Sequence, residues 1–136
     1  MELSAQFLLE SVFILEFGKI FFLLLAAHFV GDFLCQSREV ALNKTKELKY
    51  LLQHGFFVGL PVFAVFFGFQ SFLIALCLSL VYAVVHCIQD FVIWRTAFYF
   101  FGADENYSES KSFYTILGFD QFLHVSFLLF LYVFFT

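Results

Sequence analysis

The stretch AHFVGDFLCQS, residues 27–37, places His28, Asp32 and Gln36 four residues apart inside an otherwise apolar segment. An α-helix turns by about 100° per residue, so each fourth position lies only about 40° further around the helix. The three polar side chains are therefore expected on one helical face, where they can share a partner. This stretch predicts a helix with a polar stripe embedded in an apolar surface.

The same spacing returns twice further along the chain. His86 and Asp90 are four residues apart in HCIQD, and Asp120 and His124 are four apart in DQFLH. His54 completes the four histidines of the chain. Histidines and aspartates that recur at helical spacing in apolar sequence indicate facing helices that build one buried site.

The composition is that of an integral membrane protein. Of the 136 residues, 62% are hydrophobic and only 13% are charged, and the mean hydropathy is +0.92. Such values lie outside the range of soluble globular domains, so the lipid bilayer is an expected partner. The net charge of -4 argues against nucleic acid as a partner. The three cysteines have no CxxC spacing, so they are expected to serve in packing.

The apolar runs predict an all-α integral membrane protein, a single membrane domain with a bundle of four transmembrane helices. The expected spans are residues 20–36, 48–69, 72–94 and 113–135. Before them, residues 1–19 carry Glu2, Gln6 and Glu10 at helical spacing. This segment is either an interfacial amphipathic helix or the extended, exposed start of the first span, and the pattern fits both.

Two local features refine the second span. Asn43 is a suitable N-cap for a helix that starts at Lys44. Gly55 and Gly59 have the small-xxx-small spacing that allows close contact with another helix, and Pro61 is expected to kink the helix.

Basic residues predict the orientation in the membrane. Residues 37–49 contain Arg38, Lys44, Lys46 and Lys49, so the positive-inside rule places this connection in the cytoplasm. Residues 97–112 are expected to form a solvated loop on the same side. Because successive spans alternate in direction, the seven histidines and aspartates of the spans fall at one depth. The sequence therefore predicts a multi-pass membrane protein whose polar site faces the cytoplasm.

The buried aspartates need a compensating charge. An ionised aspartate near the centre of a membrane helix costs about 2.5–3.5 kcal/mol on insertion scales. A divalent metal ion would offset this, and two ions with a bound hydroxide would balance three carboxylates fully. Imidazole and carboxylate ligands suit zinc, manganese or iron. The predicted metal ligands are His28, Asp32, His54, His86, Asp90, Asp120 and His124.

Other polar residues are expected to support this site. Gln36 and Gln121 are predicted to hydrogen-bond the ligands from a second layer, because an amide is a poor ligand for zinc. Lys44 and Lys46 have two interpretations. They either set the topology at the lipid headgroups or bind an anionic substrate group beside the site.

The segments AHFVGDFLCQS, NKTKELKYLLQH, HCIQD and DQFLH together resemble an uncharacterised bacterial family of small polytopic membrane proteins, catalogued as domain of unknown function 3307. The resemblance runs from Ile20 onward. It implies no particular reaction. It implies that the functional set consists of His28, Asp32, Gln36, Lys44, Lys46, His54, His86, Asp90, Asp120, Gln121 and His124.

Three functions remain open from the sequence. The first is a metal-dependent hydrolase of a phosphate-containing or lipid-linked substrate, in which the metal activates water and Asp32, Asp90 and Asp120 are the candidate catalytic residues. The second is a transporter or proton-conducting protein that uses the cluster as a relay. The third is a non-catalytic membrane subunit in which the cluster only fixes helix packing.

Overall fold

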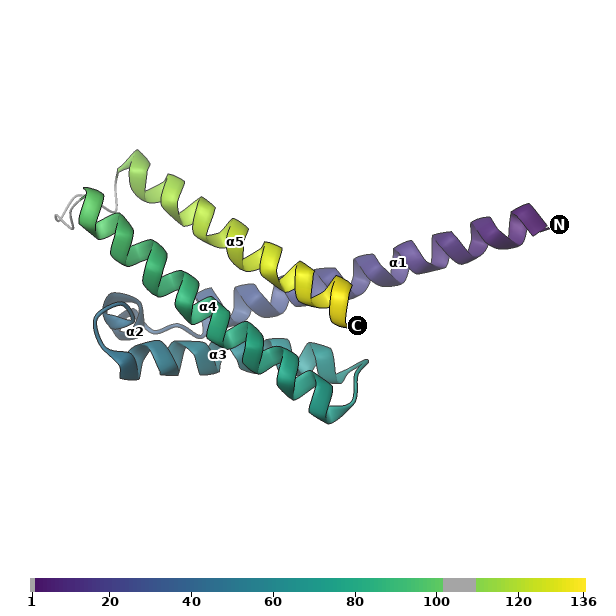
Figure 1. Cartoon of the computed structure of the whole chain (residues 1–136), viewed down its shortest axis with the longest axis horizontal. Helices are drawn as coiled ribbons and strands as arrows, with labels where there is room; N and C mark the ends of the chain where they lie inside the picture. Colours follow the sequence, from purple (N-terminus) through teal and green to yellow (C-terminus); the bar gives the residue numbers. More distant parts are fainter. Residues whose placement is uncertain (1, 102–109) are drawn as a thin grey trace.

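The protein is a bundle of long helices, seen in a computed structural model that describes residues 2–101 and 110–136. The elements are α1 (Glu2–Phe29), a short π-helical turn η1 (Val30–Leu34), α2 (Arg38–Asn43), α3 (Leu48–Phe67), α4 (Phe72–Phe101) and α5 (Lys111–Phe135), as Figure 1 shows. Four segments are long and apolar enough to cross a membrane: Leu9–Leu34, Leu48–Phe67, Phe72–Phe101 and Lys111–Phe135. The predicted fold class is confirmed.

The connection between α4 and α5 differs from the expected loop over residues 97–112. The helix continues through Phe101, because residues 97–101 (AFYFF) contain no helix-breaking residue, and the next helix starts at Lys111. Ser110 caps α5 by accepting a hydrogen bond from the Phe113 backbone N–H at 3.1 Å. The polar part of the expected loop, residues 102–109, lies outside the described residues.

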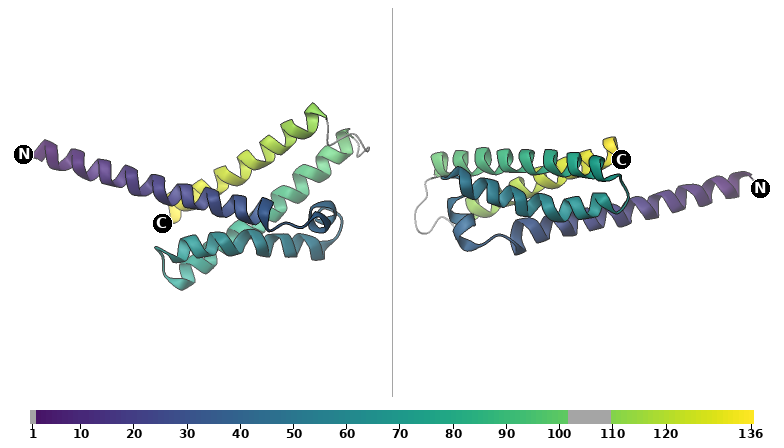
Figure 2. Two further views of the ribbon diagram at one scale, coloured as in Figure 1. Left: turned by 180° about the vertical axis from the view of Figure 1, so that it is seen from behind. Right: turned by 90° about the horizontal axis from the view of Figure 1, so that it is seen from below.

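Successive long helices alternate in direction. α1 and α4 run toward the end of the bundle that carries α2, whereas α3 and α5 run away from it (Figures 1 and 2). The N-terminal half of α1 extends beyond the other helices, where Phe7, Leu9 and Phe13 are each about 70% exposed. Of the two interpretations of residues 1–19, the structure therefore matches the exposed start of a longer helix.

The polar stripe of the first span is interrupted by η1. The Cys35 backbone N–H donates to the Val30 carbonyl at 2.9 Å, which closes a π-type turn. The helix ends at Leu34, so the expectation that Gln36 shares a helical face with His28 and Asp32 is wrong. Gly31 makes this turn possible, because a Cβ at this position would lie 2.7 Å from the Cα of Val58 in α3. The close approach brings η1, and with it Asp32, against α3.

A short helix that the sequence pattern did not predict follows η1. The Ser37 hydroxyl accepts from the Val40 N–H at 3.3 Å and starts α2. Asn43 is the last residue of α2 and donates from Nδ2 to the Glu39 carbonyl at 2.9 Å, so it does not cap α3. Glu47 precedes α3 instead. This local turn leaves Lys44 at the C-terminal end of α2, directed into the bundle.

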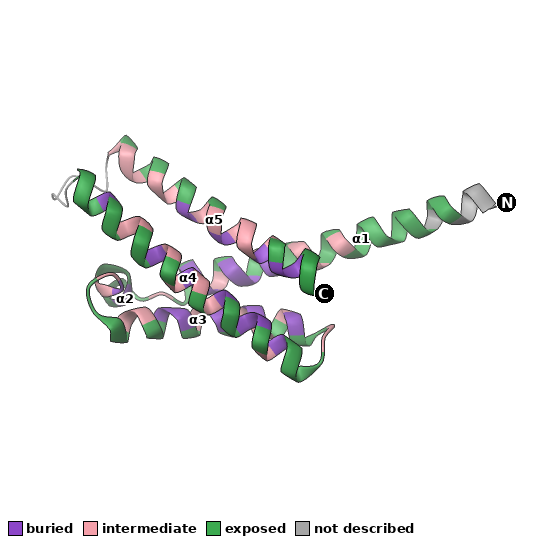
Figure 3. Ribbon diagram, viewed as in Figure 1, coloured by how far each residue is buried: buried purple, intermediate pink, exposed green. Residues whose placement is uncertain are grey.

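α3 and α4 pack closely through small residues, as the glycine spacing predicts. A Cβ at Gly55 would lie 2.6 Å from the Cys87 sulfur, and a Cβ at Gly59 would lie 3.1 Å from Ala83 Cβ. α3 is continuous through Pro61. Buried positions lie where the helices meet, and most of the N-terminal part of α1 is exposed (Figure 3). The apolar core consists of Leu24, Ala27, Val58, Val62, Phe66, Ala75, Leu78, Tyr82, Leu128, Leu131 and Tyr132.

Candidate metal centre

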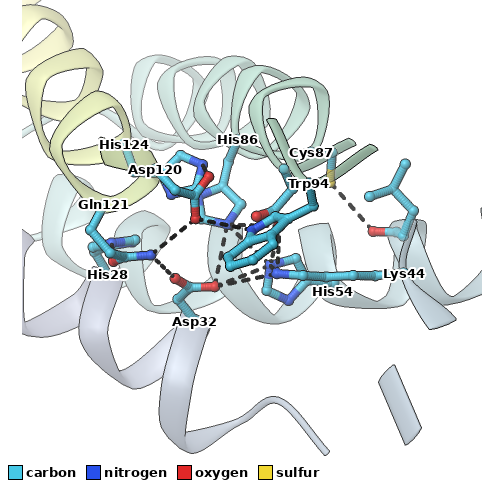
Figure 4. Close-up of polar contacts among 12 residues, drawn as sticks. His28, Asp32, Lys44, His54, His86, Cys87, Trp94, Asp120, Gln121 and His124 are labelled. Carbon is cyan, nitrogen blue, oxygen red and sulfur yellow. Dashed lines mark hydrogen bonds and ion pairs between the residues drawn. The ribbon is translucent and has the colours of Figure 1, made fainter. Parts of the chain in front are cut away.

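A cluster of buried ionisable side chains lies where α1, η1, α3, α4 and α5 meet (Figure 4). None of its members is more than 8% exposed. Together they bring every histidine of the chain into one place. The members are His28, Asp32, Lys44, His54, His86, Asp90, Asp120 and His124.

Four of these side chains, from Asp32, His54, His86 and Asp90, each bring one potential ligand atom to within 4.8 Å of the other three. The Nε2 atoms of His54 and His86 are 3.0 Å apart. Asp32 Oδ1 lies 3.2 Å and 3.5 Å from these two nitrogens, and Asp90 Oδ2 lies 2.9 Å and 3.6 Å from them. A tetrahedral zinc ion with bonds of about 2.0–2.1 Å separates its ligand atoms by about 3.3–3.4 Å. The five separations that involve the imidazole nitrogens are therefore close to those of such a coordination shell, and all four atoms lie within 4.8 Å of one another.

Lys44 is part of the same cluster. Its ammonium nitrogen lies 2.7 Å from Asp90 Oδ2, 3.3 Å from His54 Nε2 and 3.9 Å from Asp32 Oδ1. The side chain is buried, so its positive charge offsets part of the negative charge of the aspartates in a medium of low polarity. This contact changes the charge balance expected from the sequence. With Lys44 counted, one divalent cation is enough to neutralise three carboxylates.

A directional chain of hydrogen bonds holds Asp32 in place. Tyr82 OH donates to His28 Nδ1 at 2.9 Å, and His28 Nε2 donates to Gln121 Oε1 at 2.9 Å. Gln121 Nε2 then donates to Asp32 Oδ2 at 2.8 Å. The chain fixes the tautomer of His28 and uses both of its ring nitrogens. His28 consequently presents no free ligand atom in this arrangement and instead orients the aspartate.

A second group lies directly beside the first, on α4 and α5. Asp120 Oδ1 is 3.7 Å from His124 Nε2, and Trp94 Nε1 donates to Asp120 Oδ2 at 3.4 Å. The rings of His86 and His124 are stacked with centroids 3.8 Å apart. This stacking joins the two groups into one continuous polar interior.

A cavity of about 730 Å³ opens next to the cluster. Of the predicted residues that the structure does not bring into the cluster, exposed Lys46 and half-buried Gln36 both line this cavity. The wall is polar at one end and aromatic or aliphatic elsewhere. It is formed by Asp32, Phe33, Gln36, Ala41, Leu42, Lys44, Thr45, Lys46, Trp94, Phe98, Phe113, Leu117, Asp120 and Gln121.

Tyr82 and Trp94 are site residues that the sequence analysis missed. Trp94 is half-buried and bonds Asp120, whereas an interfacial anchor is the usual interpretation of such a tryptophan. The signal was present, because Tyr82, His86, Asp90 and Trp94 recur every fourth residue along α4. The polar face of α4 thus carries four such residues, compared with two in the HCIQD motif.

Comparison with known proteins assigns the chain to a family. The sequence profile of the family described as "Protein of unknown function (DUF3307)" matches residues 20–136, so the chain belongs to this family. No curated protein and no solved structure matches the chain. The matched range begins close to the point where α1 enters the bundle.

Proposed function

For this member of the DUF3307 family, we propose a membrane-embedded metal protein that hydrolyses a phosphate-containing or lipid-linked substrate. Asp32, His54, His86 and Asp90 hold a divalent cation at the centre of the cluster. The single observation that supports this assignment is the set of separations that the two imidazole Nε2 atoms make with each other and with the two carboxylate oxygens, from 2.9 Å to 3.6 Å. Two imidazoles and two carboxylates suit zinc, manganese or iron.

The cavity supports the choice of substrate. A divalent metal supplies an activated water and a positive charge for a developing oxyanion. Lys44 and Lys46 line the cavity beside the cluster and provide positive charge for a phosphate group. The aromatic wall formed by Trp94, Phe98 and Phe113 suits the chain of an amphiphile. Asp120 lies between the cavity and the cluster, on the side where the substrate group would sit.

Two residues act through others in this proposal. His28 and Gln121 orient Asp32 by the hydrogen-bond chain described above, and their loss is expected to weaken metal binding without removing a ligand. We assign His28 to this positioning role in place of the ligand role predicted from the sequence. Gln36 lines the cavity, and no role in holding the ligands is assigned to it.

The test uses detergent-purified protein stripped of metal and reloaded with zinc or manganese. Release of inorganic phosphate is measured from phosphatidic acid and from a polyprenyl diphosphate in mixed micelles. Activity is expected only in the reloaded protein, and His54→Ala is expected to lose both metal and activity. The control is Ser79→Ala, because Ser79 is buried in α4 but bonds only the Leu76 carbonyl in its own helix. If the protein binds no transition metal and releases no phosphate, the cluster serves only helix packing.

The proposed location is the bacterial inner membrane, with the α2 end in the cytoplasm. The exposed basic residues Arg38, Lys46, Lys49, Arg95 and Lys111 all lie at or toward this end and support the orientation. In a background without the native cysteines, Glu47→Cys and Thr136→Cys should react with a membrane-impermeant reagent from opposite sides. Labelling of Glu47→Cys from outside intact cells would show that the orientation is the opposite of the one proposed.

A further inference from the structure

Among the described residues, eight buried side-chain nitrogen or oxygen atoms have no hydrogen-bond partner, and four of the eight belong to Asp90, Asp120 and His124. These four are Asp90 Oδ1, Asp120 Oδ1 and both ring nitrogens of His124. Their side chains are at most 2% exposed. Leaving a buried polar atom unpaired costs about 1–3 kcal/mol, so a site that served only for packing would be expected to pair them. The unpaired atoms point to a missing ligand.

The same atoms belong to residues that can share one cation. Asp90, Asp120 and His124 each offer a ligand atom within 4.8 Å of the others. Asp120 Oδ1 and His124 Nε2 lie 3.7 Å apart. One imidazole and two carboxylates form a suitable ligand set for a divalent transition metal, with room for water or a substrate oxygen in the remaining positions.

Asp90 belongs to both groups. Its Oδ2 atom contacts Lys44 and His54 in the first group, whereas its Oδ1 atom is buried and unpaired. A carboxylate that offers one oxygen to each of two sites is the usual bridge between paired metal ions. The stacked rings of His86 and His124 place one imidazole in each group, only 3.8 Å from centroid to centroid.

We propose that Asp90, Asp120 and His124 bind a second divalent cation and that the Asp90 carboxylate bridges it to the first. The inference rests on the proposed function, because the first cation must be present for a bridge to form. Paired metal ions in hydrolytic sites lie about 3.5–4 Å apart and hold the attacking and leaving oxygens of a phosphate displacement.

The charge balance of the cluster predicts which anion binds together with the second cation. With one divalent cation, the charges of Asp32, Asp90, Asp120 and Lys44 are balanced. A second divalent cation leaves two positive charges in excess, which a dianionic phosphate group balances. The cavity wall includes both Asp120 and Lys44, so a phosphate group in the cavity would meet the second group at Asp120. The second cation and a terminal phosphate group are therefore expected to bind together.

The experiment measures manganese bound per protein, after stripping and reloading in detergent, with and without inorganic phosphate. Wild-type protein is expected to bind two ions with phosphate, and Asp120→Asn and His124→Ala are expected to bind one. The Asp120→Asn variant keeps the size of the side chain, and its retained first ion shows that it is folded. Electron paramagnetic resonance should show coupled manganese pairs in wild type and Ser79→Ala but isolated ions in Asp120→Asn.

The outcomes separate the two proposals. One ion in the wild type with and without phosphate, or two ions in Asp120→Asn, would overturn the second site and leave the proposed function in place. No bound ion in any protein would overturn both. A single ion that is lost in Asp120→Asn but kept in His54→Ala would show that the metal occupies the α4–α5 group alone, which overturns the bridge and the assignment of the first site.

Discussion

The bundle buries two regions of opposite chemistry, one on each side of the level of Tyr82. Toward the turn between α3 and α4, Val62, Phe66, Leu78 and Leu131 form a core that is at most 7% exposed. Toward α2, the same four helices bury histidines, aspartates and a lysine to a similar degree. Both regions lie among the same helices. A comparison of the two therefore shows which features helix packing requires and which features the polar residues add.

The apolar region shows that these helices can associate without charge. Small residues and close contacts suffice there, as at Gly59 against Ala83. The polar region is therefore expected to serve binding more than packing. The comparison also weighs against a proton relay, since a relay across the membrane requires polar groups or water along its whole length. Among the described residues, the buried side chains beyond Tyr82 are apolar except for Ser79 and Tyr132.

The largest expected effect comes from removing the aspartate that the polar groups share. Asp90→Ala removes the nearest carboxylate oxygen from both the Lys44 ammonium and His54 Nε2, which leaves Asp32 as their remaining carboxylate partner. Breaking a buried ion pair costs about 3–5 kcal/mol. The melting temperature in detergent and the metal content should both fall sharply. Asp90→Asn should lose metal with a smaller loss of stability. Unchanged metal content in Asp90→Ala would contradict the view that the polar region binds metal and the apolar region serves packing.

The matching change in the apolar region is Leu131→Ala. Leu131 is 3% exposed, and truncating a buried leucine costs about 2–5 kcal/mol through lost packing and the cavity left behind. Thermal unfolding in detergent should show this loss. The metal bound per folded protein should equal that of the wild type. If metal content falls in proportion to stability, the two regions act as one unit.

The contact between η1 and α3 offers a test of the backbone that carries Asp32. In Gly31→Ala the new methyl would lie 2.7 Å from Val58 Cα and 2.8 Å from the Phe57 carbonyl, so the turn must move away. Overpacking of this kind costs about 1–3 kcal/mol, and metal affinity should fall because Asp32 moves with the turn. Gly18→Ala is the control, since a Cβ there meets nothing within 4 Å. Equal metal affinity in both variants would show that the position of η1 does not affect metal binding.

The smallest expected effect distinguishes the two lysines. Removing the Lys44 charge, which lies 2.7 Å from Asp90 Oδ2, should raise metal affinity because the ammonium and the cation repel each other. A change of about tenfold in Lys44→Gln, equivalent to about 1.4 kcal/mol, is expected by competition titration with a chelator. Lys46→Gln should leave the affinity unchanged, since Lys46 is exposed at the cavity wall. Weaker metal binding in Lys44→Gln would show that the lysine supports the site only as packing.

Helical periodicity explains why most of the cluster was predictable from the sequence. The phase of a helix is a local property, so the pairs at positions 86 and 90 and at positions 120 and 124 identify their own faces. Alternating spans then bring these faces to one level. The four membrane spans followed from composition and length alone, and the structure confirms them.

Other parts of the site depend on tertiary structure. Lys44 enters the cluster because α2 forms a compact turn, and its sequence position equally suits a topology signal. Gln36 leaves the polar stripe because the backbone changes from an α-helix to a π-helical turn at η1. A pattern of residues spaced four apart does not predict such a change. The amphipathic pattern at Glu10 fits both an interfacial helix and an extension, so only the continuous α1 distinguishes them.

The unequal lengths of α3 and α4 place the cavity at a particular level of the bilayer. The 20 residues of α3 span about 30 Å, which is the thickness of the hydrocarbon layer, and the 30 residues of α4 span about 45 Å. Since the two helices meet at one turn, the last ten residues of α4 extend beyond the start of α3. In a bilayer whose hydrocarbon layer α3 spans, these turns of α4 would lie in the headgroup layer. Trp94 and Phe98 lie on this extension and line the cavity. For the lipid-linked substrate of the proposed function, this level would let a lipid in the adjacent leaflet present its headgroup to the site sideways while its chains stay in the bilayer.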